Sequence, residues 1–197
     1  FNEELYTVSV GGNPEWDAPV LRVSYTSFIQ PAQLFDYRVA TGEYTLLKEQ
    51  EVPGGYDKDE YVAYRVWSEA PDGTKIPVSI VHRADLDRTQ PNPTLLYGYG
   101  SYEANMDPYF SVFRLSLMDR DMIFAMAHVR GGGEMGRNWY DDGKMLAKKN
   151  TFTDFIAVAD DLIARNVTTP SQLVAEGGSA GGLLMGAVAN MAPDRFK

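Results

Sequence analysis

Residues Gly177-Gly-Ser179-Ala-Gly181 fit the pattern Gly-x-Ser-x-Gly, and they decide which fold we predict. A short apolar stretch, Leu173-Val-Ala175, precedes the motif, and a segment of small residues from about Ala180 to Asn190 follows it. We therefore expect a sharp turn between a strand and a helix, from which the serine hydroxyl projects beyond the sheet. Glycines suit the flanking positions because side chains there would collide. The motif predicts Ser179 as a nucleophile, although a glycine-rich turn with an incidental serine is the alternative.

The helix expected after Ser179 would also help to stabilise the charge that develops during the reaction. Its N-terminus carries free backbone N–H groups and a partial positive charge, both of which stabilise a developing oxyanion. The residue next to the nucleophile normally supplies one of these donors. The N–H of Ala180 is therefore the predicted oxyanion donor.

A serine nucleophile needs a base, and the sequence offers none in the expected place. In folds with this elbow the catalytic order along the chain is Ser, then Asp or Glu, then His. Residues 180 to 197 contain Asp194 but no histidine. The two histidines, His82 and His128, lie upstream, and we predict structural roles for both. We therefore expect the triad aspartate and histidine beyond Lys197, and the chain to be an internal fragment.

The region before the elbow alternates between predicted strands and helices, which favours an α/β class with a mainly parallel sheet covered on both faces. An Asp72-Gly73 pair predicts a hairpin between the first two strands. Thr153 is predicted to cap the second helix. The expected strands are 61–67, 75–82, 94–97, 122–127 and 173–175, and the expected helices begin near residues 110, 153 and 180.

Residues 1–52 have a different pattern. Short alternating stretches at 21–25, 33–37 and 44–48 are separated by turn residues, which predicts antiparallel strands such as those of a propeller blade. Val52-Pro-Gly-Gly55 then interrupts the pattern. We predict one domain at 1–52 and a second at 53–197.

The composition excludes several classes of protein. With 18 basic and 27 acidic residues, the net charge of −9 argues against a nucleic-acid partner. No apolar run is long enough to span a bilayer, so no membrane partner is expected. The chain has no cysteine, which excludes a thiolate nucleophile and favours a reducing, cytoplasmic location. No metal or other cofactor is expected.

Two glycine-rich segments allow more than one interpretation. Gly131-Gly-Gly-Glu-Met-Gly136 matches the dinucleotide-binding pattern, but the polar, turn-rich residues after it do not fit the helix that pattern requires. The segment Tyr97-Gly-Tyr99-Gly-Ser-Tyr102 follows a predicted strand where the elbow fold places a second oxyanion donor. The Tyr99 hydroxyl could serve as that donor, or the ring could simply pack at the sheet edge.

Taken together, three motifs resemble the prolyl oligopeptidase family of serine peptidases. They are Tyr97 to Tyr102, Arg130-Gly-Gly-Gly-Glu134 with Trp139 and Gly143, and Gly177 to Leu183. Gly-Ser-Tyr after Tyr99, Ser-Ala at the elbow and Lys148-Lys-Asn-Thr-Phe152 are most similar to the oligopeptidase B branch. The resemblance covers about residues 20–197. It implies the last blade of a β-propeller, then the N-terminal half of an α/β-hydrolase catalytic domain.

The resemblance also implies roles for single residues. Ser179 matches the nucleophile, Tyr99 the tyrosine whose hydroxyl completes the oxyanion hole, and Ala180 the residue that supplies the backbone donor. Asp107 matches the first of two aspartates at the P2 subsite, whereas Tyr109 replaces the second, which argues against a strong preference for a basic P2 residue. Tyr102 matches an aromatic residue that lines the substrate site. The glutamates that hold a P1 Arg or Lys would lie beyond Lys197.

The function expected from the resemblance is a serine endopeptidase that cleaves short basic peptides after Arg or Lys through an acyl-enzyme. A prolyl-specific oligopeptidase or an esterase on the same scaffold is the alternative. A chain without its base could also be catalytically inert.

Overall fold

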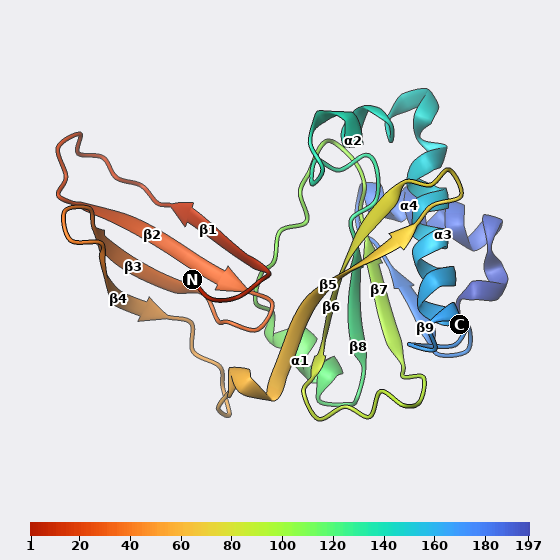
Figure 1. The fold of residues 1–197 in the computed structure, drawn as a ribbon, viewed down its shortest axis with the longest axis horizontal. Helices are drawn as coiled ribbons and strands as arrows, with labels where there is room; N and C mark the ends of the chain where they lie inside the picture. Colours follow the sequence, from red (N-terminus) through yellow and green to blue (C-terminus); the bar gives the residue numbers. More distant parts are fainter.

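The computed structural model describes all residues 1–197 and contains two β-sheets joined by one connection (Figure 1). The first sheet is antiparallel throughout, in the order β1-β2-β3-β4. Its strands are β1 (Tyr6–Val10), β2 (Val20–Ser27), β3 (Gln33–Arg38) and β4 (Glu43–Glu49). The three predicted stretches are therefore strands, and β1 is a fourth that the alternating pattern had not indicated.

The second sheet has the order β5-β6-β8-β7-β9. Its strands are β5 (Tyr61–Glu69), β6 (Lys75–Arg83), β7 (Thr94–Gly98), β8 (Ile123–Ala127) and β9 (Leu173–Glu176). The predicted hairpin is confirmed, with β5 antiparallel to β6. The prediction of a mainly parallel sheet is wrong for these residues. Strand β7 is parallel to β8 and β9, but β6 pairs antiparallel with β8 because the hairpin at Asp72-Gly73 reverses the chain.

The helices lie on both faces of the second sheet. They are α1 (Val112–Met118), α2 (Arg137–Asp141), α3 (Lys149–Ala164) and α4 (Ala180–Met191), with short 3₁₀ turns at Lys58–Glu60, Met145–Ala147 and Pro193–Arg195. The predicted cap at Thr153 is wrong. Helix α3 begins four residues earlier, and the Thr153 hydroxyl donates back to the carbonyls of Lys149 and Asn150 inside the helix.

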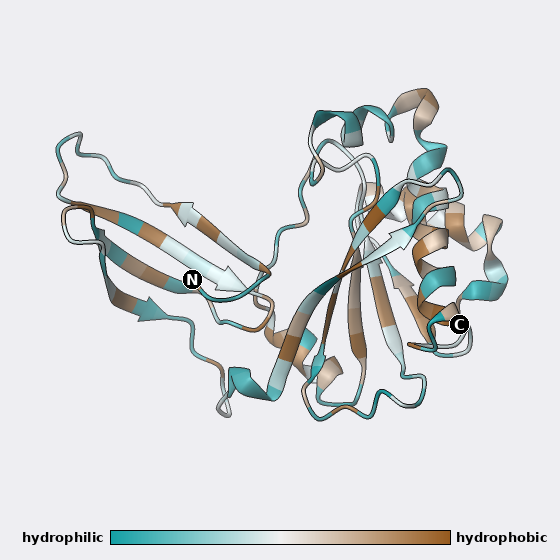
Figure 2. Ribbon diagram, in the orientation of Figure 1, coloured by the Kyte–Doolittle hydropathy of each residue, from teal (hydrophilic) through white to brown (hydrophobic).

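Two clusters of buried apolar side chains lie on opposite faces of the second sheet. The larger packs the sheet against α3 and α4, with Phe155, Val158 and Leu184 fully buried. The smaller cluster packs the opposite face against α1 and includes Phe28, which directly follows β2. Strand β8 is buried along its whole length, as expected for a central strand covered on both faces, and it is apolar throughout in Figure 2.

The first sheet contacts the loop that leads into α1. The Thr7 hydroxyl donates to the carbonyl of Pro108 at 2.7 Å, and the Phe110 amide donates to the Thr26 hydroxyl at 3.2 Å. The predicted domain boundary at residue 52 falls in the connection between β4 and β5 and stays a prediction. None of the helices combines the length and the apolar character that crossing a bilayer requires.

Candidate active site

Ser179 lies between Gly178, the second of the two glycines that follow β9, and Ala180, the first residue of α4. Its backbone has φ 54° and ψ −119°, a conformation that non-glycine residues seldom adopt. Such a residue costs on the order of 1–3 kcal/mol and persists only where the surrounding structure imposes it. The side chain is exposed. The predicted turn is thus present, with a strained serine that reaches solvent.

The glycines around Ser179 allow the backbone to turn tightly. A Cβ on Gly177 would lie 2.7 Å from the carbonyl oxygen of Gly181, and a Cβ on Gly181 would lie 2.9 Å from the carbonyl oxygen of Gly98. Both distances are shorter than real Cβ contacts. The sequence argument therefore holds at these two positions, while Gly178 and Gly182 have free space around them.

The backbone N–H of Ala180 is available to a ligand. It is the first residue of α4, so no carbonyl of the same helix can accept from it. The turn bonds begin one residue later, where Gly181 donates to Gly178 and Gly182 donates to Ser179. Because the Ala180 amide has no protein acceptor, it can bind a negatively charged oxygen next to Ser179.

Tyr99 lies beside this helix start. It directly follows β7, whose parallel partner β9 leads into Ser179. A Cβ on Gly181 would lie 3.6 Å from the ring of Tyr99 and 3.7 Å from its Cα. The Tyr99 hydroxyl makes no hydrogen bond within the protein, so its donor is free. The structure therefore brings three of the predicted site residues, Ser179, Ala180 and Tyr99, to one edge of the sheet.

The predicted substrate-binding residues follow Tyr99 on the loop between β7 and α1. Tyr102 is 77% exposed, with φ 60°, and Asp107 is exposed. Tyr109, which stands where the resemblance implies a second aspartate, lies against the guanidinium of Arg114, with 4.8 Å between the Arg114 Cζ and the ring centroid. The three side chains share one loop with Tyr99, as a substrate-binding role requires. Their roles stay predictions.

The loop after Tyr99 is anchored by residues to which the motifs alone had given no role. The Lys148 ammonium donates to the carbonyl of Gly100 and to the hydroxyl of Ser101. The Met106 amide donates to a Glu134 carboxylate oxygen at 3.0 Å. Lys148 and Glu134 belong to motifs already noted for their family resemblance. Nothing in the local sequence, however, shows that they contact a loop so far away along the chain.

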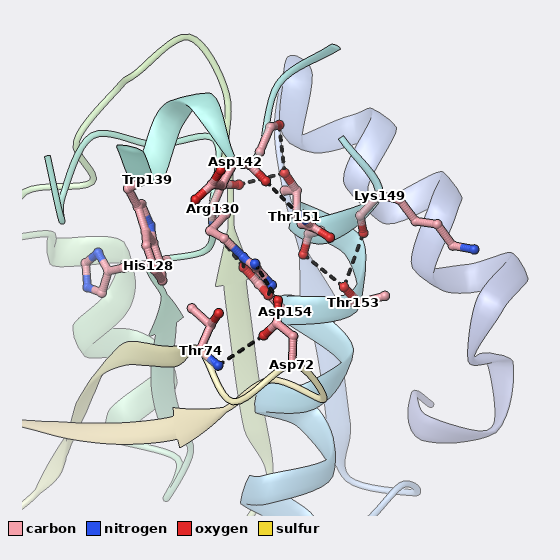
Figure 3. Close-up of polar contacts among 12 residues, drawn as sticks. Asp72, Thr74, His128, Arg130, Trp139, Asp142, Lys149, Thr151, Thr153 and Asp154 are labelled. Carbon is pink, nitrogen blue, oxygen red and sulfur yellow. Dashed lines mark hydrogen bonds and ion pairs between the residues drawn. The ribbon is translucent and has the colours of Figure 1, made fainter. Parts of the chain in front are cut away.

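A buried ion pair holds the start of α3 against the segment after β8 (Figure 3). The Arg130 guanidinium binds both carboxylate oxygens of Asp154, at 2.9 and 2.6 Å, and reaches Asp72 at 2.7 Å. The Thr151 hydroxyl donates to the Arg130 carbonyl at 2.6 Å. These contacts join the hairpin, the Arg130 segment and α3, and Thr151 also packs against Gly100 in the Tyr99 loop.

Both histidines are buried away from solvent and have other partners. His82 shares a hydrogen bond with the Arg83 carbonyl, and burial lowers its pKa. His128 lies between the Ser79 hydroxyl at 2.8 Å and Glu134 at 3.4 Å, an order that mimics a catalytic triad. Ser79, however, is 0% exposed on β6 and cannot meet a substrate. The predicted structural roles agree with these positions.

Close packing explains the first three glycines of residues 131–136, whereas Gly136 has free space around it and a φ of 88°. A Cβ on Gly131 would lie 2.1 Å from the carbonyl oxygen of Gly100 and 3.0 Å from that of Gly143. Helix α2, which follows Gly136, is only five residues long. The segment therefore lacks the long helix of a dinucleotide site. The structure also contains no group of three or more His, Cys, Asp or Glu side chains placed to hold a metal ion.

Comparisons with protein families match both parts of the chain. The model of the prolyl oligopeptidase N-terminal beta-propeller domain matches residues 1–50. The model of the prolyl oligopeptidase family matches residues 108–197, which include the elbow.

Two curated relatives match the whole chain. Dipeptidyl aminopeptidase BI of Pseudoxanthomonas mexicana is 52% identical over 197 residues, and Protease 2 of Moraxella lacunata is 45% identical over the same length. The chain spans 27% and 29% of these two proteins.

Two solved structures of oligopeptidase B also match the whole chain. Oligopeptidase B from Leishmania major superposes with a TM-score of 0.94 at 50% identity, and oligopeptidase B from Trypanosoma brucei with 0.95 at 50%. In both cases all of this chain and 28% of the other chain are covered.

These matches confirm the fold class, in which the last strands of a β-propeller precede the first half of an α/β-hydrolase domain. The strand order of the second sheet and the elbow at Ser179 agree with that assignment. The chain belongs to the prolyl oligopeptidase family, and it is similar to the oligopeptidase B members of that family.

Proposed function

We propose that the protein is a serine peptidase that cleaves short peptides on the C-terminal side of Arg or Lys. The observation that supports the serine-peptidase chemistry is the geometry at the elbow, where an exposed, strained Ser179 adjoins the unpaired Ala180 amide and the free hydroxyl of Tyr99. A nucleophile next to two oxyanion donors suits acyl transfer.

In the proposed mechanism the Ser179 oxygen attacks the scissile carbonyl carbon. The Ala180 N–H and the Tyr99 O–H donate to the oxyanion of the tetrahedral intermediate. The base that took the Ser179 proton passes it to the leaving amine as the C–N bond breaks, which leaves an acyl group on Ser179 that water hydrolyses. The solved oligopeptidase B from Trypanosoma brucei carries covalently bound antipain, which supports covalent chemistry in a similar protein.

The proton of Ser179 requires a base. His82 and His128 do not qualify because both are 2% exposed and have other partners. We expect the triad histidine and aspartate in the part of the natural chain that follows Lys197, as the family resemblance implies. The residues described here would then supply the nucleophile and the oxyanion donors.

The preference for basic peptides is supported by charge and by similarity. The net charge of −9 attracts cationic substrates, and Asp107 and Tyr102 project from the loop next to Tyr99. The resemblance to the oligopeptidase B branch, which implies cleavage after Arg or Lys, points in the same direction. A cytoplasmic location stays a prediction from composition.

A second candidate function is the release of dipeptides from a free N-terminus. It is favoured by the 52% identity to a protein named dipeptidyl aminopeptidase BI. Cleavage after proline has weaker support, since a prolyl endopeptidase of Elizabethkingia meningoseptica is 38% identical over 90% of this chain.

A panel of fluorogenic peptides, tested on the full natural chain, would separate these functions. The panel would carry Arg, Lys, Pro or Ala at P1, each with a free and with an acylated N-terminus, and a Ser179→Ala variant would provide the background rate. We expect cleavage after Arg and Lys in the acylated peptides. Cleavage of only the free peptides would favour the dipeptidyl activity, and cleavage after Pro alone would refute the proposed specificity.

A further inference from the structure

Lys148 is a half-buried ammonium group that contacts no carboxylate. Its Nζ lies 2.5 Å from the carbonyl oxygen of Gly100 and 2.8 Å from the hydroxyl oxygen of Ser101, and both acceptors are uncharged. Burial lowers its pKa, and no neighbouring charge opposes that change. A buried charge without an opposite charge costs free energy. Its location is therefore informative, since stability alone would favour an apolar side chain there.

The two acceptors of Lys148 directly follow Tyr99. The backbone on either side of Tyr99 is already packed tightly. A Cβ on Gly98 would lie 2.7 Å from the ring of Phe155, and a Cβ on Gly100 would lie 2.5 Å from the methyl group of Thr151. Thr151 and Phe155 lie on α3, and Lys148 caps the same helix. One helix start therefore contacts the chain before and after Tyr99.

The carbonyl oxygen of Gly100 packs closely against Gly131, and the Lys148 ammonium is the group that hydrogen-bonds to it. Gly100 has φ +66°, a region that glycine enters and leaves at little cost. The bond from Lys148 to its carbonyl fixes this peptide, and the bond to Ser101 fixes the next residue. Rotation at these positions would displace Tyr99, whose hydroxyl has no other hydrogen bond.

We propose that Lys148 is a positioning residue for the oxyanion hole, which acts by holding the Gly100-Ser101 backbone so that the Tyr99 hydroxyl faces the reacting carbonyl. The inference rests on the proposed function and deepens it. Lys148 does not touch the substrate. It limits the positions of Tyr99, and a donor misplaced by about 1 Å can cost a hundredfold in rate.

The test compares neighbouring lysines in the full natural chain. Lys148→Met keeps an unbranched side chain that is one atom shorter and removes its donors. Lys149→Met is the matched control because Lys149 is exposed, forms no ion pair and points away from the Thr151 and Arg130 cluster in Figure 3. We expect Lys148→Met to lower kcat about 10- to 100-fold with KM within about twofold, and Lys149→Met to match the wild type.

A Tyr99→Phe background distinguishes positioning from general support of the fold. If Lys148 acts through the Tyr99 hydroxyl, Lys148→Met should cause almost no further loss of kcat once that hydroxyl is absent. Lys148→Arg, which retains the charge and the donors, should recover part of the rate. An equal loss in both backgrounds, or wild-type kinetics for Lys148→Met, would overturn the inference.

A second variant keeps the test valid if Lys148→Met does not fold, which a thermal unfolding curve would reveal. Ser101→Ala removes one acceptor and leaves the Gly100 contact in place. We expect it to lower kcat about threefold in the wild type and to have no effect in the Tyr99→Phe background. Unchanged kcat in the wild type would refute the positioning role.

The two proposals fail in different ways. If Ser179→Ala retained activity, or if the wild type hydrolysed no peptide, the proposed function would be wrong whatever the lysine variants do. If Ser179→Ala and Tyr99→Phe lost activity while Lys148→Met did not, only the role of Lys148 would be wrong.

Discussion

Tyr99 and Ser179 follow two adjacent parallel strands, two and three residues beyond the pair formed by Tyr97 and Glu176. The register of β7 and β9 thereby fixes the relative position of a candidate oxyanion donor and a candidate nucleophile. The close approach of Gly181 to the carbonyl of Gly98 leaves little freedom between the two turns. The relative position of the two backbones is therefore set by the sheet, and the contacts of Lys148 hold the loop that follows Tyr99.

The Tyr99 hydroxyl is expected to contribute to turnover more than to binding. Tyr99→Phe in the full natural chain should lower kcat about 10²- to 10³-fold with a small effect on KM, because the oxyanion forms only after attack. Tyr97→Phe is a suitable control, since its hydroxyl also makes no hydrogen bond and it lies two residues away. Equal kinetics for the two variants would assign Tyr99 to packing.

The loop carrying Asp107 and Tyr109 is expected to set the preference at P2. Tyr109→Asp should raise kcat/KM for peptides with Arg at P2 relative to Ala, because it adds a second carboxylate next to Asp107. Tyr109→Asn provides the control, with the same shape and no charge. If the Tyr109→Asn and Tyr109→Asp variants gave the same ratio of kcat/KM for Arg over Ala at P2, the charge at residue 109 would not determine the P2 preference.

The ion pair between Arg130 and Asp154 is expected to be important for folding. Arg130→Met would leave the carboxylate of Asp154 buried and unpaired, which should lower the free energy of unfolding by about 3–5 kcal/mol. Arg137→Met, which breaks the exposed pair with Glu103, should cost less than about 1 kcal/mol. Chemical denaturation measures both, and similar losses would argue against the distinction between the two pairs.

His82 is expected to make stability depend on pH. Burial lowers its pKa in the folded state, and Nε2 has no hydrogen-bond partner, so the folded state resists protonation. The unfolded state binds a proton below a pH of about 6.5, so the free energy of unfolding should fall as the pH decreases below that value. The decrease between pH 7 and 5.5 should be smaller in His82→Gln. An unchanged slope would exclude His82 as its source.

The parts of the site predicted from sequence are those that depend on neighbouring residues. The elbow was predictable because strand, glycines, serine and helix follow one another within residues 173–191. The start of α3 was not predictable from its local sequence, because Thr153 is a suitable cap residue. Lys148 and Thr151 instead contact distant loops, and the helix begins at Lys149. The mixed sheet was missed for a similar reason, since the direction of β6 relative to β8 depends on a pairing across 40 residues of chain or more.

The central claim is that Ser179 is the nucleophile, and covalent labelling tests it most directly. The full natural chain would be treated with a fluorophosphonate, digested and analysed by mass spectrometry, with a Ser179→Ala variant treated in parallel. The account predicts one modified residue, Ser179, with loss of peptidase activity in proportion to labelling and no labelling of the variant. Inactivation through a different serine, or a Ser179→Ala variant that still hydrolyses peptides, would contradict it.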